Sequence, residues 1–224
     1  MNKKTKKKIQ IAEAAADRYV ENERFSFESL AEKMGTDTKE ILNHFPSRRS
    51  ILEFYYEAQL IRYREISSKI DGYDQFTLAE KLSNLALTLL DLFNENREFV
   101  VKSYSRFIVC TRNKTAFEKQ ILSEFDEIIS EDQNKSTITA FLNSTLLHRA
   151  LLHHFHGLVK FWSTDRSENF QKSMELIDKW TALAEAIAYS GITDKAAGLA
   201  KFLIYNSPFK ECSVNRKNMR DSNE

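Results

Sequence analysis

Glycine and proline are scarce in this chain, and their scarcity limits the folds open to it more than any other feature. Only 5 Gly and 2 Pro occur among 224 residues, which is well below their usual share in a soluble domain. Sheets need these residues at their tight turns, whereas helices joined by short polar connections do not. We therefore expect an all-α protein built from long helices.

The rest of the composition is that of an ordinary globular protein. Hydrophobic residues make up 42% of the chain and charged residues 29%, and no stretch approaches the about 20 consecutive apolar residues of a membrane span. Two cysteines are too few for a disulfide framework, and no apolar signal segment is found at the N-terminus. We expect a cytoplasmic protein with a substantial core and no contact with a membrane.

Residues 26–52 have the pattern of a helix-turn-helix followed by a third helix. Ser26 is placed to cap the first helix, and Gly35 ends that helix where a left-handed backbone is needed. A second short helix is expected to turn Ile41 and Leu42 toward the core and polar side chains outward. Two short helices joined by a tight turn are a common means of placing one helix in the DNA major groove.

These residues resemble the helix-turn-helix of the TetR/AcrR family of bacterial transcriptional regulators. The shared features are a serine cap, an aliphatic residue before alanine, a glycine at the turn, a closing phenylalanine, a serine–arginine pair and an aliphatic pair. In this chain they are Ser26, Leu30-Ala31, Gly35, Phe45, Ser47-Arg48 and Ile51-Leu52. The resemblance implies an N-terminal three-helix head that binds DNA, followed by a helical domain that binds an effector and dimerises.

Two positions depart from the pattern of the family. The segment 21–24 lacks the glycine that usually separates the first two helices, and Asn22 is expected to supply a left-handed backbone instead. Leu42 stands where many members carry a tyrosine that touches a phosphate. Together with the acidic Asp37 and Glu40, it supports an alternative interpretation, a helical scaffold protein whose head does not bind specific DNA sequences.

The candidate DNA-binding residues lie in and around the second helix of the motif. Their polar groups are expected to meet base edges or the phosphate backbone. Arg48 matches the basic position of the family, so it is expected to hold a phosphate where the next helix begins. The candidates are Ser26, Thr36, Asp37, Thr38, Lys39, Asn43, His44 and Arg48.

Five lysines occur among the first eight residues, at Lys3, Lys4, Lys6, Lys7 and Lys8. We interpret them as a basic arm ahead of the first helix. Such an arm could lie along phosphates or enter the minor groove, with a steep dependence on salt. The alternative is a solubilising, disordered terminus, because lysine-rich ends are common in proteins that never meet nucleic acid.

Beyond the motif, apolar residues recur at helical spacing between short polar breaks. A long helix from residue 47 to about 70 would connect the head to the rest of the molecule, so its displacement would move the DNA-binding helix. Further helices are expected at 77–94, 97–110, 115–130, 136–162, 167–189 and 194–206. The apolar surface of 167–189 is wider than one core contact needs, which favours a homodimer over an internal helix of a monomer.

We divide the chain into three parts by expected function. Residues 1–46 form the helix-turn-helix DNA-binding domain, and residues 47–206 form a helical effector-binding and dimerisation domain. Residues 207–224 are polar and basic and are expected to be disordered.

Aromatic residues are frequent in the middle helices, where most should simply pack in the core. The resemblance implies that some of them line a pocket for a small, apolar or aromatic effector whose identity the sequence does not give. The candidates are Tyr63, Tyr104, Phe107, Phe125 and His148. We expect the effector to favour a dimer whose heads are wrongly spaced for half-sites about 34–36 Å apart, and so to weaken DNA binding. Repression is the outcome expected by analogy.

Four of the five histidines, His148, His153, His154 and His156, cluster in one predicted helix. His153 and His156 lie one helical turn apart and could touch a common metal. The spacing is not that of a zinc hydrolase, so packing or an interface is favoured and we expect no metal and no cofactor. Nucleophile elbows, phosphate-binding loops and CxxC pairs are also absent from the sequence, which leaves an enzyme as the least supported class.

Overall fold

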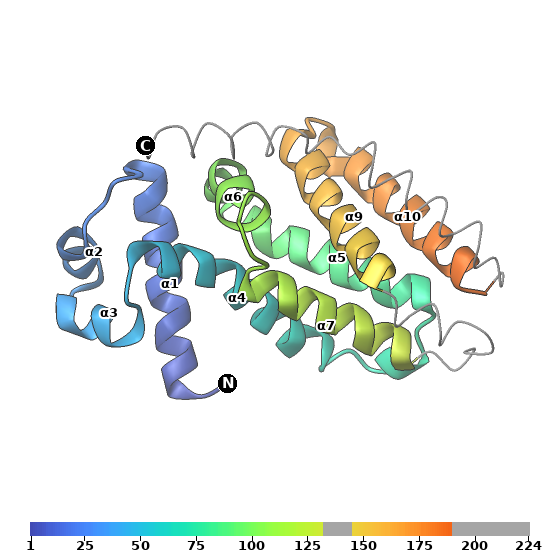
Figure 1. The fold of residues 1–224 in the computed structure, drawn as a ribbon, viewed down its shortest axis with the longest axis horizontal. Helices are drawn as coiled ribbons and strands as arrows, with labels where there is room; N and C mark the ends of the chain where they lie inside the picture. The colour runs from blue at the N-terminus through green and yellow to red at the C-terminus, as the bar shows by residue number, and fades with distance from the viewer. Residues whose placement is uncertain (132–144, 190–224) are drawn as a thin grey trace. The chain divides into compact units, whose positions relative to one another are not determined.

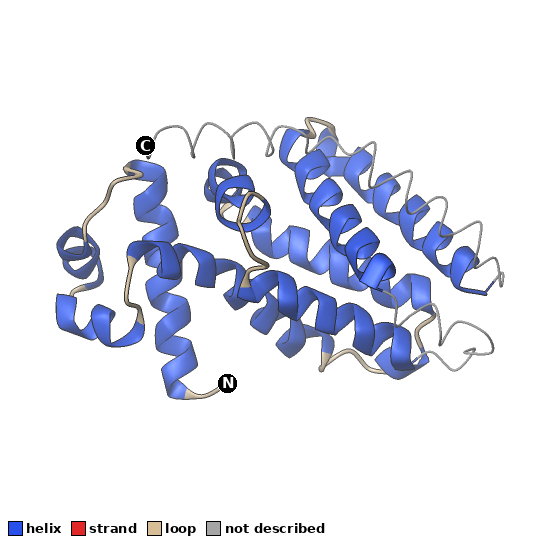
Figure 2. Cartoon of the chain, viewed as in Figure 1, coloured by secondary structure: helices blue, strands red, loops and turns tan. Residues whose placement is uncertain are grey.

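The computed structural model describes residues 1–131 and 145–189, and these residues form helices joined by loops and turns (Figures 1 and 2). No strand occurs in these ranges, and the predicted all-α fold is confirmed. The α-helices are α1 Lys3–Glu21, α2 Phe27–Met34, α3 Thr38–His44, α4 Arg48–Ser67, α5 Leu78–Asn94, α6 Arg97–Tyr104, α7 Ala116–Glu131, α9 Thr145–Thr164 and α10 Gln171–Tyr189. Shorter turns are η1 Tyr73–Gln75, η2 Ser105–Val109 and η3 Glu168–Phe170. No helix within the described ranges is long and apolar enough to span a membrane.

Some predicted segments lie outside the described residues. These are the helix at 194–206, the tail at 207–224 and the first part of the helix predicted at 136–162. The helix predicted at 97–110 is one α-helix only as far as Tyr104. A π-turn then follows, in which the backbone N–H of Cys110 donates to the carbonyl of Ser105 at 2.8 Å.

The described helices form two compact units, and both α5 and α7 contribute to each of them. The first unit is Met1–Asp71 with Thr88–Gln120, and the second is Gly72–Leu87 with Ile121–Glu224. In the first unit α1 packs along α4 and α6, and α2 packs on α1 and α3. The three head helices therefore share a core with the start of the long connecting helix. The division of functions after residue 46 remains a prediction.

Helix α4 is buried around most of its circumference, whereas the sequence predicted burial of one side only. The buried residues predicted from the sequence are confirmed, and others join them. They are Ile51, Leu52, Phe54, Tyr55, Tyr56, Ala58, Gln59, Leu60 and Tyr63. The ring of Tyr56 lies 5.9 Å from that of Phe99 and 5.7 Å from that of Phe93, centroid to centroid. Its hydroxyl is also hydrogen-bonded to the Ser103 hydroxyl at 2.6 Å.

Polar contacts fasten α1 and α4 to the connection between α5 and α6 within the first unit. The guanidinium of Arg62 on α4 donates to both carboxylate oxygens of Glu95, at 2.5 and 2.7 Å. It also lies 3.8 Å from the carboxylate of Glu13 on α1. One residue beyond Glu95, the side-chain amide of Asn96 donates to Asp17 of α1 at 2.9 Å. A displacement of α4 would therefore disturb contacts that hold α1.

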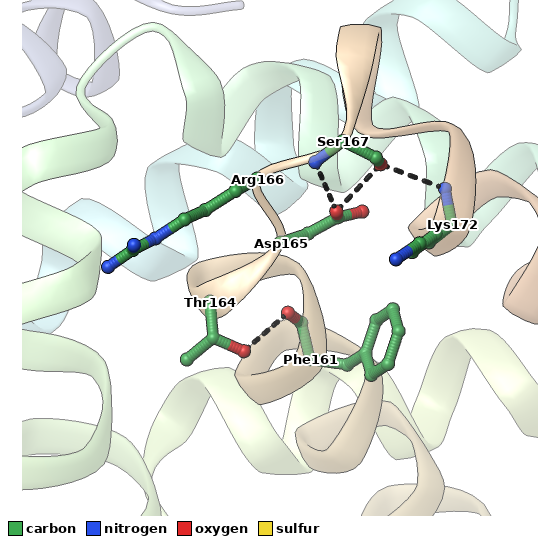
Figure 3. Close-up of a pocket in the computed structure, with 6 residues that line it drawn as sticks. All are labelled: Phe161, Thr164, Asp165, Arg166, Ser167 and Lys172. Atoms are coloured by element: carbon green, nitrogen blue, oxygen red, sulfur yellow. Dashed lines mark hydrogen bonds between the residues drawn. The ribbon is translucent and has the colours of Figure 1, made fainter.

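In the second unit, the connection from α9 to α10 is organised by the carboxylate of Asp165 (Figure 3). One of its oxygens accepts from the N–H and hydroxyl of Ser167, and the other accepts from the N–H and hydroxyl of Ser173. These donors hold the pKa of Asp165 well below its usual range. The backbone turns left-handed at Asn169 and Phe170, with φ of 47° and 57°. The helix predicted from residue 167 therefore begins only at Gln171.

The same connection borders a hollow of about 370 Å³. Its lining residues are Phe161, Thr164, Asp165, Arg166, Ser167 and Lys172 (Figure 3). The carboxylate of Asp165 in this lining is already used by the hydrogen bonds from Ser167 and Ser173, so its presence has a structural explanation.

Candidate nucleic-acid interface

The first helix of the predicted motif, α2, begins and ends as its sequence indicates. The hydroxyl of Ser26 accepts from the N–H of Ser29 at 3.1 Å, and the Ser29 hydroxyl accepts from the N–H of Ser26 at 3.2 Å. This reciprocal pair is a capping box, and it gives Ser26 a clear structural role. Gly35 ends the helix with φ of 60° and ψ of 37°, the predicted left-handed conformation.

The connection from α1 to α2 works differently from the prediction. Asn22 has an extended backbone, with φ of −153°, so the expected left-handed geometry is wrong. Its side-chain oxygen instead accepts from the N–H of Arg24 at 2.9 Å. Because this short-range hydrogen bond makes the turn, the segment needs no glycine.

The acidic residues near α3 have structural partners. Asp37 is the N-cap of α3, and its carboxylate accepts from the N–H of Lys39 at 3.0 Å. The carboxylate of Glu40 accepts from the Thr36 hydroxyl and pairs with the Lys7 ammonium at 2.9 Å. The hydrogen bond from Thr36, and then the one from Lys7, lower the pKa of Glu40. The fold therefore gives both acidic residues structural roles, and the scaffold alternative loses part of its support from the sequence.

Helix α3 has a narrow buried stripe and a wide exposed face. Ile41 is fully buried, and Phe45, which ends the helix, is 3% exposed. Leu42 is 45% exposed, so the prediction that it turns toward the core is wrong. The reason is geometric, because consecutive helical residues point about 100° apart and the spacing of four from Ile41 to Phe45 selects the buried line. Lys39 and Asn43 share the exposed face with Leu42.

The lysines at the start of the chain are part of α1, and neither the arm nor the disordered terminus is correct. The helix begins at Lys3, and the side chain of Asn2 caps it by accepting from the N–H of Thr5 at 2.8 Å. Sequence reasoning missed that two of these lysines contact residues distant in sequence. Lys7 pairs with Glu40 as described, and the Lys8 ammonium lies 4.9 Å from the ring centroid of Phe45. Only the helical positions of these lysines relative to distant residues could have revealed this.

The remaining lysines of this group and the two arginines at the start of α4 carry positive charge on exposed side chains. Lys3, Lys4 and Lys6 are exposed on α1. Arg48 is also exposed, although one of its guanidinium nitrogens donates to the carbonyl of Phe25 at 2.5 Å. Its neighbour Arg49, which was not among the candidates, has a side chain 60% exposed and pairs with Glu53 of the same helix at 2.6 Å. The adjacent arginines at positions 48 and 49 were the sequence feature that could have identified Arg49 as a candidate.

Two other candidates of α3 are partly covered. Thr38, its first residue, is half-buried. His44, its last residue, is also half-buried, and its Nδ1 atom is enclosed with no hydrogen-bond partner. The candidates best exposed for a base edge are therefore Lys39 and Asn43.

The four candidate effector-binding residues whose side chains the structure describes are buried, and they occur in both units. Tyr63, Tyr104 and Phe107 belong to the first unit, and Phe125 belongs to the second. Burial raises the pKa of Tyr104 well above its usual range, and its ring lies 5.4 Å from that of Tyr56. The side chain of His148 lies outside the described residues. That these residues line one pocket remains a prediction.

The histidines of α9 whose side chains the structure describes, His153, His154 and His156, lie in the second unit. The ring of His154 lies 6.1 Å from that of Trp180, and His156 is buried. Burial lowers the pKa values of His153 and His154, which favours their neutral forms. Among the side chains that the structure describes, no group of three or more His, Cys, Asp or Glu residues is arranged to hold a metal ion.

Comparison with protein families gives one match. The model of the tetracycline repressor-like C-terminal domain matches residues 81–203, which is more than half of the 224-residue chain. Curated proteins gave no match. The matched region and the helix-turn-helix at 26–52 do not overlap, so two separate parts of the sequence point to the same kind of protein.

Proposed function

The chain belongs to the TetR family of regulators, and we propose that it is a homodimeric repressor that a small effector releases from a palindromic operator. Regulators of this family generally bind DNA, dimerise and respond to small ligands, and they are not a class of enzymes. The homodimer, operator release, repression and location in the cytoplasm are the parts of the proposal that go beyond membership of the family.

The observation that carries the proposal is the exposed face of α3. This helix is capped by Asp37 and buried along Ile41, and it turns Lys39 and Asn43 outward. An asparagine side chain suits adenine, and a lysine suits guanine or a phosphate. The exposed Arg49 and the exposed lysines of α1 supply further charge for the backbone of the DNA.

Helix α4 is the element we propose for regulation. It begins beside the head, where Arg48 donates to the carbonyl of Phe25. Its middle is enclosed by aromatic side chains, and Arg62 connects it to Glu13 of α1. An effector that displaces α4 would change the placement of the head, and with it the spacing of two heads in a dimer. By linkage, the effector would then lower the affinity for DNA by the same factor as DNA lowers the affinity for the effector.

Selection of random double-stranded DNA on the purified protein tests the proposal. We expect enrichment of a palindrome that binds two protomers, and we expect Lys39→Ala and Asn43→Ala each to weaken its binding about tenfold or more, the value of a good base contact. Lys119→Ala and Asn94→Ala remove exposed side chains of the same types outside the helix-turn-helix, and they should bind as the wild type does.

Failure to enrich any sequence, with only weak and salt-sensitive binding, would contradict the proposal and favour a scaffold protein. The sign of regulation needs a second measurement, in which the selected site is placed over a reporter promoter. A repressor lowers reporter output, and a cognate effector restores it.

A further inference from the structure

Leu42 has an exposure that the packing of the head does not explain. Across residues 2–65, all of which the structure describes, it is the only large apolar side chain that stands exposed. Other large apolar side chains around it, such as Ile41 and Phe45, are buried. An isolated exposed leucine is common on protein surfaces, so its position relative to other groups decides its meaning.

The position of Leu42 is in the middle of the face proposed to meet DNA. Residues four apart lie above one another on a helix, so Thr38 and Leu42 form one line and Lys39 and Asn43 form the next. Leu42 and Asn43 therefore lie on adjacent lines of the same exposed face. A base edge that met this face would meet polar groups and one apolar group together.

The major groove offers one apolar group of this kind, the C5-methyl group of thymine. Phosphates and the other base edges present oxygen and nitrogen atoms, with which a leucine forms no hydrogen bond. Contact between a leucine and a methyl group removes apolar surface of both from water, and that transfer is favourable. The polar neighbour fits as well, since the amide of Asn43 suits the N6 and N7 atoms of an adenine.

We propose that Leu42 is a specificity-determining residue that contacts the methyl group of a thymine in each half-site of the operator. The inference rests on the proposed function, because it requires α3 to enter the major groove. Different residues would then provide the affinity for the DNA backbone and the preference for particular bases. The exposed lysines and arginines would supply the salt-dependent part of binding, and Leu42 would supply discrimination without charge.

The test removes the methyl group and the leucine separately and together. Each thymine of the selected site is replaced in turn by deoxyuridine, which differs only in lacking the C5-methyl group. For the wild type we expect one symmetric pair of positions at which replacement in one half-site weakens binding about fourfold, and in both about fifteenfold, from the burial of one methyl group per half-site. Leu42→Ala should bind the thymine and deoxyuridine forms of that position equally.

Ile66→Ala is the matched control, because it shortens another exposed aliphatic side chain of the first unit, 42% exposed and near the end of α4. It should discriminate thymine from deoxyuridine as the wild type does. The slope of affinity against salt concentration should be the same for all three proteins, since no charge changes. Thermal melting will show that the variants are folded, and the exposure of both side chains makes a loss of fold unexpected.

The outcomes separate the inference from the function beneath it. An enriched site at which Leu42→Ala retains the wild-type sensitivity to every methyl group would overturn the inference and leave the DNA-binding function standing. A site without any methyl-sensitive thymine would overturn it as well. If no site is enriched at all, the proposed function fails and this inference fails with it.

Discussion

The ammonium of Lys7 on α1 lies 2.9 Å from the carboxylate of Glu40 on α3, so the first helix holds the proposed DNA-binding helix directly. Glu40 also accepts from the hydroxyl of Thr36 at the turn between α2 and α3. The contact joins residues 33 positions apart in sequence (40 minus 7). It connects α3 to the first turns of α1.

The Lys7–Glu40 pair should affect DNA binding more than stability. Surface ion pairs contribute little to folding, so Lys7→Ala and Glu40→Gln should both melt close to the wild type. If the pair orients α3, each variant should weaken operator binding, by about tenfold where one base contact is lost. Titration of the selected DNA site measures this.

The two variants distinguish orientation from simple charge. Lys7→Ala removes a positive charge and Glu40→Gln removes a negative one, so an effect of charge alone would change affinity in opposite directions. Tighter binding by Glu40→Gln would show that Lys7 acts on phosphates and does not position α3.

Gly35 should be sensitive to any side chain because of its backbone and not because of crowding. A Cβ atom at this position would meet no atom within 4 Å, but φ is +60°. We expect Gly35→Ala to lower the free energy of unfolding by about 1–2 kcal/mol, measured by urea denaturation with an unchanged m-value. Asparagine tolerates left-handed backbone better, so Gly35→Asn should cost less; equal losses would point to a cause other than φ.

Local chemistry made the cap and the turn of α2 predictable. Ser26 and Gly35 act through backbone groups within a few residues of themselves, and that information is present in the sequence alone. The exposure of Leu42 was not predictable in the same way. Ile41 and Leu42 are adjacent and equally apolar, and a helix of seven residues gives too few turns to decide which one faces the core.

The structural role of the lysines at the start of the chain was not predictable from local sequence. Their composition suggested an arm or a disordered end, but the partners that keep Lys7 and Lys8 in place, Glu40 and Phe45, are distant in sequence. The break before α10 was missed for a similar reason. It depends on how one carboxylate, that of Asp165, is shared between Ser167 and Ser173, and the helical periodicity of the segment gives no sign of it.

Asp165 should stabilise the second unit in a way that depends on pH. Its pKa is lowered in the folded state by the hydrogen bonds from Ser173 and Ser167. Its contribution is therefore present above its unfolded pKa, which is about 3.9, and it is lost as the pH falls toward the folded value. We expect Asp165→Asn to melt at a lower temperature than the wild type at pH 7 and the difference to shrink below about pH 4. Asp178→Asn, on the exposed side of α10, is the control, and a pH-independent difference for Asp165→Asn would contradict the assignment to its charge.

The buried hydrogen bond between Tyr56 and Ser103 gives the sharpest test of the core of the first unit. Both residues are fully enclosed, at 0% exposure, and their hydroxyl oxygens are 2.6 Å apart. Tyr56→Phe keeps the ring and its aromatic contacts, but it leaves the Ser103 hydroxyl without this partner, which should cost about 1–3 kcal/mol. Ser103→Ala should similarly strand the tyrosine hydroxyl.

The double variant, Tyr56→Phe with Ser103→Ala, leaves neither hydroxyl behind. Its loss in the free energy of unfolding should therefore be smaller than the sum of the two single losses, with a coupling of at least about 0.5 kcal/mol. Urea denaturation of all four proteins measures that coupling. Strict additivity would mean that each hydroxyl finds another partner when the first is removed, and the hydrogen bond would then contribute nothing of its own to joining α4 and α6.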